Sequence, residues 1–167
     1  MRITNLAEYG LICAVHLARR PEGSLVSGRE IAEAERLSPD TVEQILLRLR
    51  RAGLARSTRG ARGGYQLARA ATTISVRDVI EAAEESVFEL NCDSHPVDPS
   101  RCAPSHACSI RPVWLLLQTR INDVLAGVSL ADLVAMEHDL ERRDAFASRP
   151  ADPGVTSITR RLPVLAD

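Results

Sequence analysis

Three of the four cysteines in this 167-residue chain lie in one polar segment and are the residues best suited to chemistry. Cys92, Cys102 and Cys108 are separated by nine and by five residues, among Asp, Ser, His and Pro. Thiolates are soft ligands, and three of them on one flexible loop can converge on a metal centre. Zinc sites usually carry closely paired cysteines, a spacing that is absent here. The spacing favours a metal or iron–sulfur site, with free or redox-active thiols as the alternative.

A two-iron or four-iron cluster held by three cysteines lacks one protein ligand. The fourth ligand must then be a histidine, a carboxylate, a small molecule or a group from another subunit. His95 and His106 lie in the same segment and are as well suited to being solvated loop residues as ligands. The remaining cysteine, Cys13, falls on the apolar face of a predicted helix, which favours a buried structural thiol.

Composition and charge narrow the function classes. Residues 1–70 contain twelve Arg and seven acidic residues, whereas residues 71–167 contain nine Arg and fifteen acidic residues. A basic first half beside an acidic second half suits a protein that meets phosphate on one side. The sequence shows neither a signal peptide nor an apolar run long enough for a membrane span. We therefore expect a cytoplasmic protein with no membrane partner, whose thiols do not form a disulfide framework.

The first half of the chain carries the start and stop signals of three helices. A first helix is predicted from about Thr4 to Arg19, before Pro21. Ser27 and Glu30 form a capping-box pattern that opens a second helix. A third helix has Ser38 as N-cap, Pro39 at its first position and Gly53 after its end. Two short helices joined by a tight turn are typical of a helix-turn-helix.

A basic hairpin is predicted directly after these helices. Strand-like runs at 54–58 and 64–67 flank the segment 59–63, Arg-Gly-Ala-Arg-Gly, whose glycines permit a tight turn. The two arginines, Arg59 and Arg62, would project from its tip. A basic hairpin after a helix-turn-helix is a wing that can enter a minor groove. An ordinary surface hairpin with solvated charges is the alternative.

The second half of the chain contains a long amphipathic helix. A fourth helix follows Ser75, and after the cysteine segment apolar residues recur from Ile110 to Val124 at spacings of four and three. This narrow seam favours pairing with a second copy of the chain, with packing against its own body as the alternative. Four parts are expected: a winged-helix DNA-binding domain over 1–84, a cysteine-containing cluster-binding loop over 85–109, a dimerisation helix with a short following helix over 110–142, and a flexible tail over 143–167.

In these segments the chain resembles a known family of winged-helix transcription regulators of the Rrf-two type, which includes the iron–sulfur assembly regulator IscR and the nitric-oxide-sensing repressor NsrR. The resemblance covers roughly residues 1–135. It is carried, in the expected order, by residues 1–4, 38–44, 59–65 and 75–80, the three cysteines, and residues 129–133. The resemblance implies a mostly α fold: a winged helix-turn-helix with a small β-hairpin wing and a long C-terminal dimerisation helix.

The resemblance also implies a ligand set. In the family three loop cysteines hold a [2Fe–2S] or [4Fe–4S] cluster, which places these ligands on Cys92, Cys102 and Cys108. The first gap between them is longer here than usual, and Arg111 replaces the histidine ligand of the assembly regulators. In the nitric-oxide-sensing relatives a carboxylate near the start of the first helix reaches the partner's cluster. Glu8 occupies that position, one methylene longer than the usual Asp.

The expected function is DNA-binding transcriptional regulation of repressor type, without enzyme activity or a small-molecule substrate. The protein would bind a double-stranded operator as a homodimer and sense redox state, nitric oxide or iron status through the cluster. The alternative is a cluster-free repressor controlled by a thiol switch or a partner protein. An electron carrier or cluster enzyme finds no further support in the sequence. The DNA-binding set is Ser38, Asp40, Thr41, Glu43 and Gln44 near base edges, Arg48, Arg50 and Arg51 on phosphates, and Arg59 and Arg62 in the minor groove.

Overall fold

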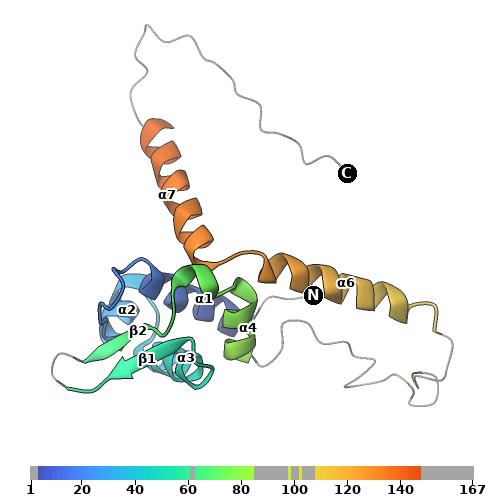
Figure 1. Cartoon of the computed structure of the whole chain (residues 1–167), viewed down its shortest axis with the longest axis horizontal. Helices are drawn as coiled ribbons and strands as arrows, with labels where there is room; N and C mark the ends of the chain where they lie inside the picture. The colour runs from blue at the N-terminus through green and yellow to red at the C-terminus, as the bar shows by residue number, and fades with distance from the viewer. Residues whose placement is uncertain (1–3, 61–62, 85–97, 99–101, 103–107, 148–167) are drawn as a thin grey trace, which may run out of the picture.

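The computed structural model describes residues 4–60, 63–84, 98, 102 and 108–147, and the side chains among them up to residue 140. A helical head carries a two-stranded hairpin at one edge, and two further helices project from it (Figure 1). The elements, in chain order, are α1 (Asn5–Ala18), α2 (Gly28–Glu35), α3 (Pro39–Arg51), β1 (Ala55–Thr58), β2 (Gly64–Leu67), the 3-10 turn η1 (Ala71–Thr73), α4 (Val76–Glu84), α6 (Arg111–Ala126) and α7 (Leu130–Ala147). The mostly helical winged fold expected from the sequence is confirmed.

The predicted helix caps form as hydrogen bonds. The Ser27 hydroxyl accepts from the Glu30 N–H at 3.1 Å, and the Ser38 hydroxyl accepts from the Thr41 N–H at 3.2 Å. The Glu30 carboxylate pairs with Arg20 at 2.6 Å. Each cap satisfies one backbone donor that a helix start leaves unpaired, so α2 and α3 begin at fixed residues.

The core lies between α1, α3 and α4, beneath the helix-turn-helix. Ile45, Leu46 and Leu49 of α3 are buried against residues of the other helices, including Ile31 of α2 and Val79 of α4. These positions follow the helical repeat and leave the opposite face of α3 polar. The core therefore decides which face of α3 is turned to solvent.

The hairpin is attached to the head by an isolated antiparallel β-bridge between Tyr65 and Val26. In the antiparallel pair Ser57 lies opposite Tyr65, and Tyr65 also exchanges two backbone hydrogen bonds with Val26, at 2.9 and 2.7 Å. A Cβ atom on Gly64 would lie 2.6 Å from the Val26 carbonyl oxygen, so this close approach requires glycine. The wing is thereby fixed to the segment that precedes α2.

The helices α6 and α7 extend away from the head in different directions (Figure 1). Seven apolar residues at the start of and along α6 are between 41% and 66% exposed: Ile110, Val113, Trp114, Leu115, Leu116, Leu117 and Val124. The sequence predicted only a short helix after residue 129. The helix α7 instead reaches Ala147, because no Gly or Pro interrupts the chain before Pro150. Within the described ranges, no helix is long and apolar enough to cross a membrane.

Candidate nucleic-acid interface and cysteine site

The outward face of α3 carries most of the predicted base-contacting residues. Asp40, Glu43 and Gln44 are exposed, on the side away from the buried Ile45 and Leu49. Side chains three and four positions apart share a helix face, so these three form one continuous polar surface over the first turns. The structure therefore brings together three of the side chains predicted to read base edges.

Ser38 and Thr41 also lie at the start of α3, but their hydroxyls are engaged with each other. The two oxygens lie 2.7 Å apart, and the Ser38 oxygen also accepts from the Thr41 backbone. This cap fixes the angle at which the chain enters the helix. Both residues thus position the polar face of α3, whatever contact they make with a ligand.

The Glu43 side chain is held by the wing. The Tyr65 hydroxyl, on β2, donates to the Glu43 carboxylate at 3.1 Å. Partial burial, followed by this hydrogen bond, raises the pKa of Tyr65, so the hydroxyl stays a donor at neutral pH. A Cβ atom on Gly28 would lie 2.3 Å from the other carboxylate oxygen of Glu43, so this glycine leaves room for the carboxylate. Glu43 therefore connects α3 to both α2 and the hairpin.

Tyr65 was not among the site residues predicted from the sequence. Its position two residues after Gly63, in the strand that faces the third helix, was the available signal. A hydroxyl-bearing aromatic residue at the base of a wing can reach the neighbouring helix, but the identity of its acceptor depends on how the hairpin packs.

The three arginines near the end of α3 have different surroundings. Arg51 is exposed, and Arg50 is exposed with one N–H donated to the Ser57 hydroxyl of β1 at 3.3 Å. Arg48 is half-buried, and its guanidinium donates to the backbone carbonyl of Ala83 in α4. Two of the three predicted phosphate contacts thus face solvent, whereas Arg48 is turned toward the protein.

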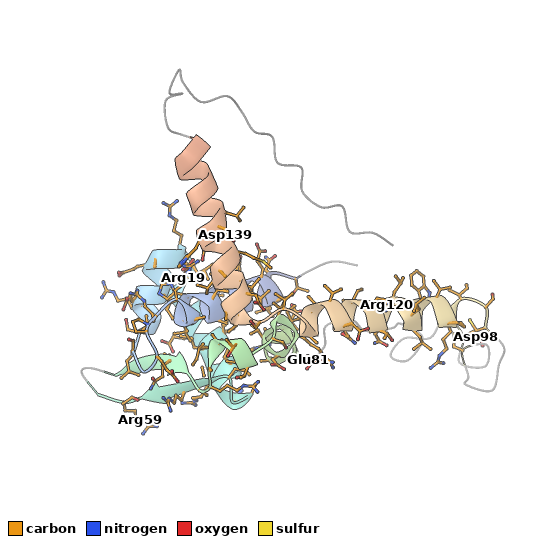
Figure 2. All side chains as sticks on the ribbon, turned by 45° about the horizontal axis from the view of Figure 1, so that its top comes forward. Arg19, Arg59, Glu81, Asp98, Arg120 and Asp139 are labelled. Atoms are coloured by element: carbon orange, nitrogen blue, oxygen red, sulfur yellow. The ribbon has the colours of Figure 1, made fainter. Side chains whose placement is uncertain are left out.

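The wing presents Arg59 to solvent. Arg59 directly follows β1, is exposed, and lies on the hairpin well away from the helical core (Figure 2). The next residue, Gly60, has a φ of 123°, a conformation that favours glycine and allows the chain to turn. The second predicted wing arginine, Arg62, lies outside the described residues.

Two of the three predicted cysteine ligands are described. Cys102 and Cys108 are half-buried thiols just before α6. The Cys102 N–H donates to the Asp98 carbonyl at 2.9 Å, and the Cys102 carbonyl lies 3.5 Å from a guanidinium nitrogen of Arg111. Arg111, at the position of the assembly regulators' histidine, thus contacts the backbone of the cysteine segment. The two thiols are soft donors and fit an iron–sulfur cluster in kind.

The other expected ligands are not gathered with these thiols in the described part of the chain. Cys92, His95 and His106 lie outside the described residues. Glu8 lies in the first turn of α1 and is exposed. Among the described residues, no group of three His, Cys, Asp or Glu side chains is arranged to hold a metal ion. A carboxylate on the outer face of α1 remains accessible to a second copy of the chain.

Cys13 differs from the other cysteines in its environment. It is fully buried in α1, and burial, together with the negative charge of Glu35, raises its pKa to about 12. One turn further along α1, His16 Nδ1 lies 2.6 Å from Glu35, which also accepts from Arg19 at 3.0 Å. A thiol with so high a pKa is protonated at physiological pH, which disfavours reaction as a thiolate. The expected burial of Cys13 is confirmed.

A helix-turn-helix with an outward polar recognition face, followed by an arginine-bearing hairpin, defines a winged-helix DNA-binding regulator. The Rrf2 family, described as iron-dependent transcriptional regulators, matches residues 3–136. The chain is 36% identical over 135 residues to the ORF2 protein of Azotobacter vinelandii, whose name places it among HTH-type transcriptional regulators; this covers 81% of this chain and 80% of that protein. It is 32% identical over 144 residues to IscR of Vibrio vulnificus, covering 86% and 83%.

A solved structure gives the same result for the fold. The global cysteine regulator CymR of B. subtilis superposes with a TM-score of 0.63 and 29% identity, covering 81% of this chain and 98% of CymR. The chain belongs to the Rrf2 family. Like its relatives, it is a DNA-binding transcriptional regulator and not an enzyme.

The exposure of Arg59 on the wing leads to a first prediction, which concerns DNA affinity. Arg59→Ala should weaken binding to a target DNA by about 1–3 kcal/mol and flatten its salt dependence, because a guanidinium leaves the phosphate-lined groove. Titrations at several salt concentrations measure both quantities. Arg120→Ala is the matched control, because Arg120 lies on α6 far from the hairpin (Figure 2). If Arg59→Ala and Arg62→Ala both leave affinity and salt slope unchanged, the wing does not contact DNA.

The buried thiol makes a second prediction. Iodoacetamide at about pH 8 should label the cysteines of the segment 92–108 in the folded apo protein while Cys13 stays unmodified, because only thiolates react and Cys13 remains protonated. Peptide mass spectrometry identifies the labelled residues. In urea all four cysteines should react, which shows that Cys13 is protected by the fold. Equal labelling rates in the folded protein would contradict the assignment.

Proposed function

We propose that this regulator is a homodimeric repressor that binds a double-stranded operator and senses redox state, nitric oxide or iron status through an iron–sulfur cluster. The cluster ligands are Cys92, Cys102 and Cys108, with Glu8 of the partner subunit as the fourth. One observation carries the proposal: two half-buried thiols lie near the start of a helix whose apolar side chains are exposed, Cys108 three residues before it and Cys102 with its carbonyl 3.5 Å from Arg111. A change at the thiols thus acts next to the surface that joins two copies.

The proposal of a dimer rests on α6. The seven exposed apolar side chains along α6, here called its apolar row, cost free energy in water, and a group of this size marks an interaction surface. Trp114, Leu117 and Val124 of this row are spaced by three and seven residues, so they share one face of α6. Pairing with the same row on a second copy is the arrangement that a seam of this kind favours.

DNA binding in the dimer uses α3 and the wing of each copy. The polar face formed by Asp40, Glu43 and Gln44 suits the major groove, where amides and carboxylates can distinguish bases. Arg50 and Arg51 lie at the end of the same helix, where guanidinium groups can neutralise phosphates. Arg59 reaches beyond α3 on the hairpin, as a minor-groove contact requires.

For the cluster, the chain supplies thiolates from the cysteine segment and a carboxylate, Glu8, from α1. When bound, the cluster supplies iron that reacts with oxygen or nitric oxide. Thiolate sulfur is the softer and tighter ligand, so the cysteines retain the cluster, while a carboxylate is the harder and more labile one. The exposure of Glu8 at the start of α1 supports the proposal that it is such an exchangeable ligand from the partner subunit. Its release would leave the cysteines in place and alter the surroundings of α1.

A thiol switch without a cluster is the second candidate, and the likeness to the cysteine regulator CymR favours it. Half-buried thiols at 102 and 108 can also undergo thiol–disulfide exchange. Purification under anaerobic conditions distinguishes the two. Brown protein with charge-transfer absorption in the visible range supports the cluster, whereas colourless protein that changes DNA affinity on thiol oxidation supports the switch.

The dimer surface makes a third prediction. Leu117→Asp should convert the dimer to a monomer, because an unpaired charge in an apolar interface costs several kcal/mol. Sedimentation velocity measures the mass, and circular dichroism checks the fold. Thr119→Asp is the matched control, because it adds the same charge on the face of α6 opposite to the seam formed by Trp114, Leu117 and Val124. A folded Leu117→Asp protein that remains dimeric would show that the seam does not join the two copies.

The carboxylate makes a fourth prediction. Glu8→Ala should still yield cluster-bearing protein, but with an altered visible spectrum, faster loss of the cluster in oxygen and changed DNA affinity, because a labile ligand tunes the site without building it. Replacing any one of Cys92, Cys102 or Cys108 should leave little or no cluster. Glu33→Ala, at an exposed acid of α2, is the control. An unchanged Glu8→Ala spectrum with a large change in His95→Ala or His106→Ala would assign the fourth ligand to a histidine.

A further inference from the structure

The last turn of α4 is held by polar contacts from two other helices. From α3, the Arg48 guanidinium donates to the Ala83 carbonyl. At the other side, the Glu84 carboxylate accepts from the Ala7 N–H in the first turn of α1 at 3.1 Å. Ala83 and Glu84 are the last two residues of α4 that the structure describes, and the sequence continues from Glu84 toward the segment that contains the three cysteines.

The contact of Arg48 is made to a backbone carbonyl of α4. A carbonyl oxygen has two lone pairs, and a hydrogen bond to it from a guanidinium is charge-assisted. Arg48 is half-buried, unlike its exposed neighbours Arg50 and Arg51. Its guanidinium therefore contacts the backbone of α4 and does not lie on the outward surface of α3.

The contact of Glu84 suits the beginning of a helix. The Ala7 N–H donates to two acceptors, the Thr4 hydroxyl at 3.3 Å and the Glu84 carboxylate at 3.1 Å. A negative charge near the unpaired N–H groups of a helix start is favourable. The end of α4 thus contributes to the cap of α1, directly beside Glu8.

Packing prevents the end of α4 from moving independently of α1. Gly10 of α1 faces Ala83 so closely that a Cβ atom on Gly10 would lie 3.0 Å from the Ala83 Cβ. Ala83 is fully buried. A displacement of this turn must therefore move α1 as well, and it must either move α3 or break the contact between Arg48 of α3 and Ala83.

We propose that Arg48 is a positioning residue that couples the cysteine segment to the recognition helix, with Glu84 as its counterpart on α1. A change in the segment after Glu84 shifts the last turn of α4, and Arg48 passes that shift to α3. The coupling signal rests on the proposed function, whereas the positioning role of Arg48 follows from the contacts alone. Arg48 then affects DNA binding without touching phosphate.

The first experiment separates positioning from phosphate contact. DNA affinity of the full-length protein is titrated against salt for Arg48→Gln and for the matched variant Arg51→Gln. Arg51→Gln should reduce the slope of log affinity against log salt by about one, because one phosphate contact is lost. Arg48→Gln should lower affinity severalfold and leave the slope of the wild type. A slope reduced equally in both variants would overturn the positioning role.

The second experiment measures the coupling. Affinity is compared for protein reconstituted anaerobically with iron and sulfide, and for the same protein stripped by chelator and oxidised. Arg48→Gln and Glu84→Ala should bring the ratio of the two affinities close to one, and Glu84→Gln, which keeps an acceptor oxygen, should retain more of it. A wild-type ratio that persists in Arg48→Gln would overturn the coupling.

Amide hydrogen exchange in the stripped protein tests the contacts without a cluster. Arg48→Gln and Glu84→Ala should speed exchange in the last turn of α4, and Glu84→Ala also at Ala7. Unchanged exchange in both variants would overturn the positioning role. If the wild type itself shows equal affinities in the two states, the proposed sensing fails and the coupling with it, while the exchange rates and salt slopes still decide the positioning role.

Discussion

The burial of one face of α3 is the constraint on which the rest of the structure depends. Ile45, Leu46 and Leu49 are buried to 1% exposure or less, so the helix cannot rotate without exposing them. Rotation by one residue would bring polar side chains into the core, where each unpaired group costs free energy. The outward position of Asp40 and Gln44 is therefore a consequence of the apolar pattern of α3.

The same head is joined to α6 and α7 by backbone contacts that leave little freedom at the junction. The Val76 N–H donates to the Val128 carbonyl at 2.8 Å, and the Leu130 N–H donates to the Ile74 carbonyl at 2.9 Å. Leu130 is fully buried in the core. The connection between α6 and α7 is thus part of the head. The junction that follows α6 also contains the start of α4.

Local signals in the sequence were sufficient for the helices of the head. Ser27, Ser38 and Gly53 mark ends that depend on hydrogen bonds within a few residues, and those ends form as predicted. Long side chains were less predictable, because Arg48 can reach either solvent or another helix, and only the packing of α3 on α4 decides between them. The Tyr65–Glu43 contact depends in the same way on the hairpin's position. The cysteine ligand set remains a prediction, since Cys92 lies outside the described residues.

Polar contacts to Glu35 and Glu137 hold the C-terminal end of α1. His16 and Arg19 both contact the Glu35 carboxylate of α2, and Arg19 also pairs with Glu137 of α7 at 2.5 Å. These contacts fix the C-terminal half of α1 to two other helices. The buried Cys13 lies beside them with a pKa of about 12. The first turn is different: Glu8 is exposed, and the Ala7 N–H beside it is capped from α4. The contacts of α4 with α1 thus include its first turn, where Glu8, the one acid of that helix, lies.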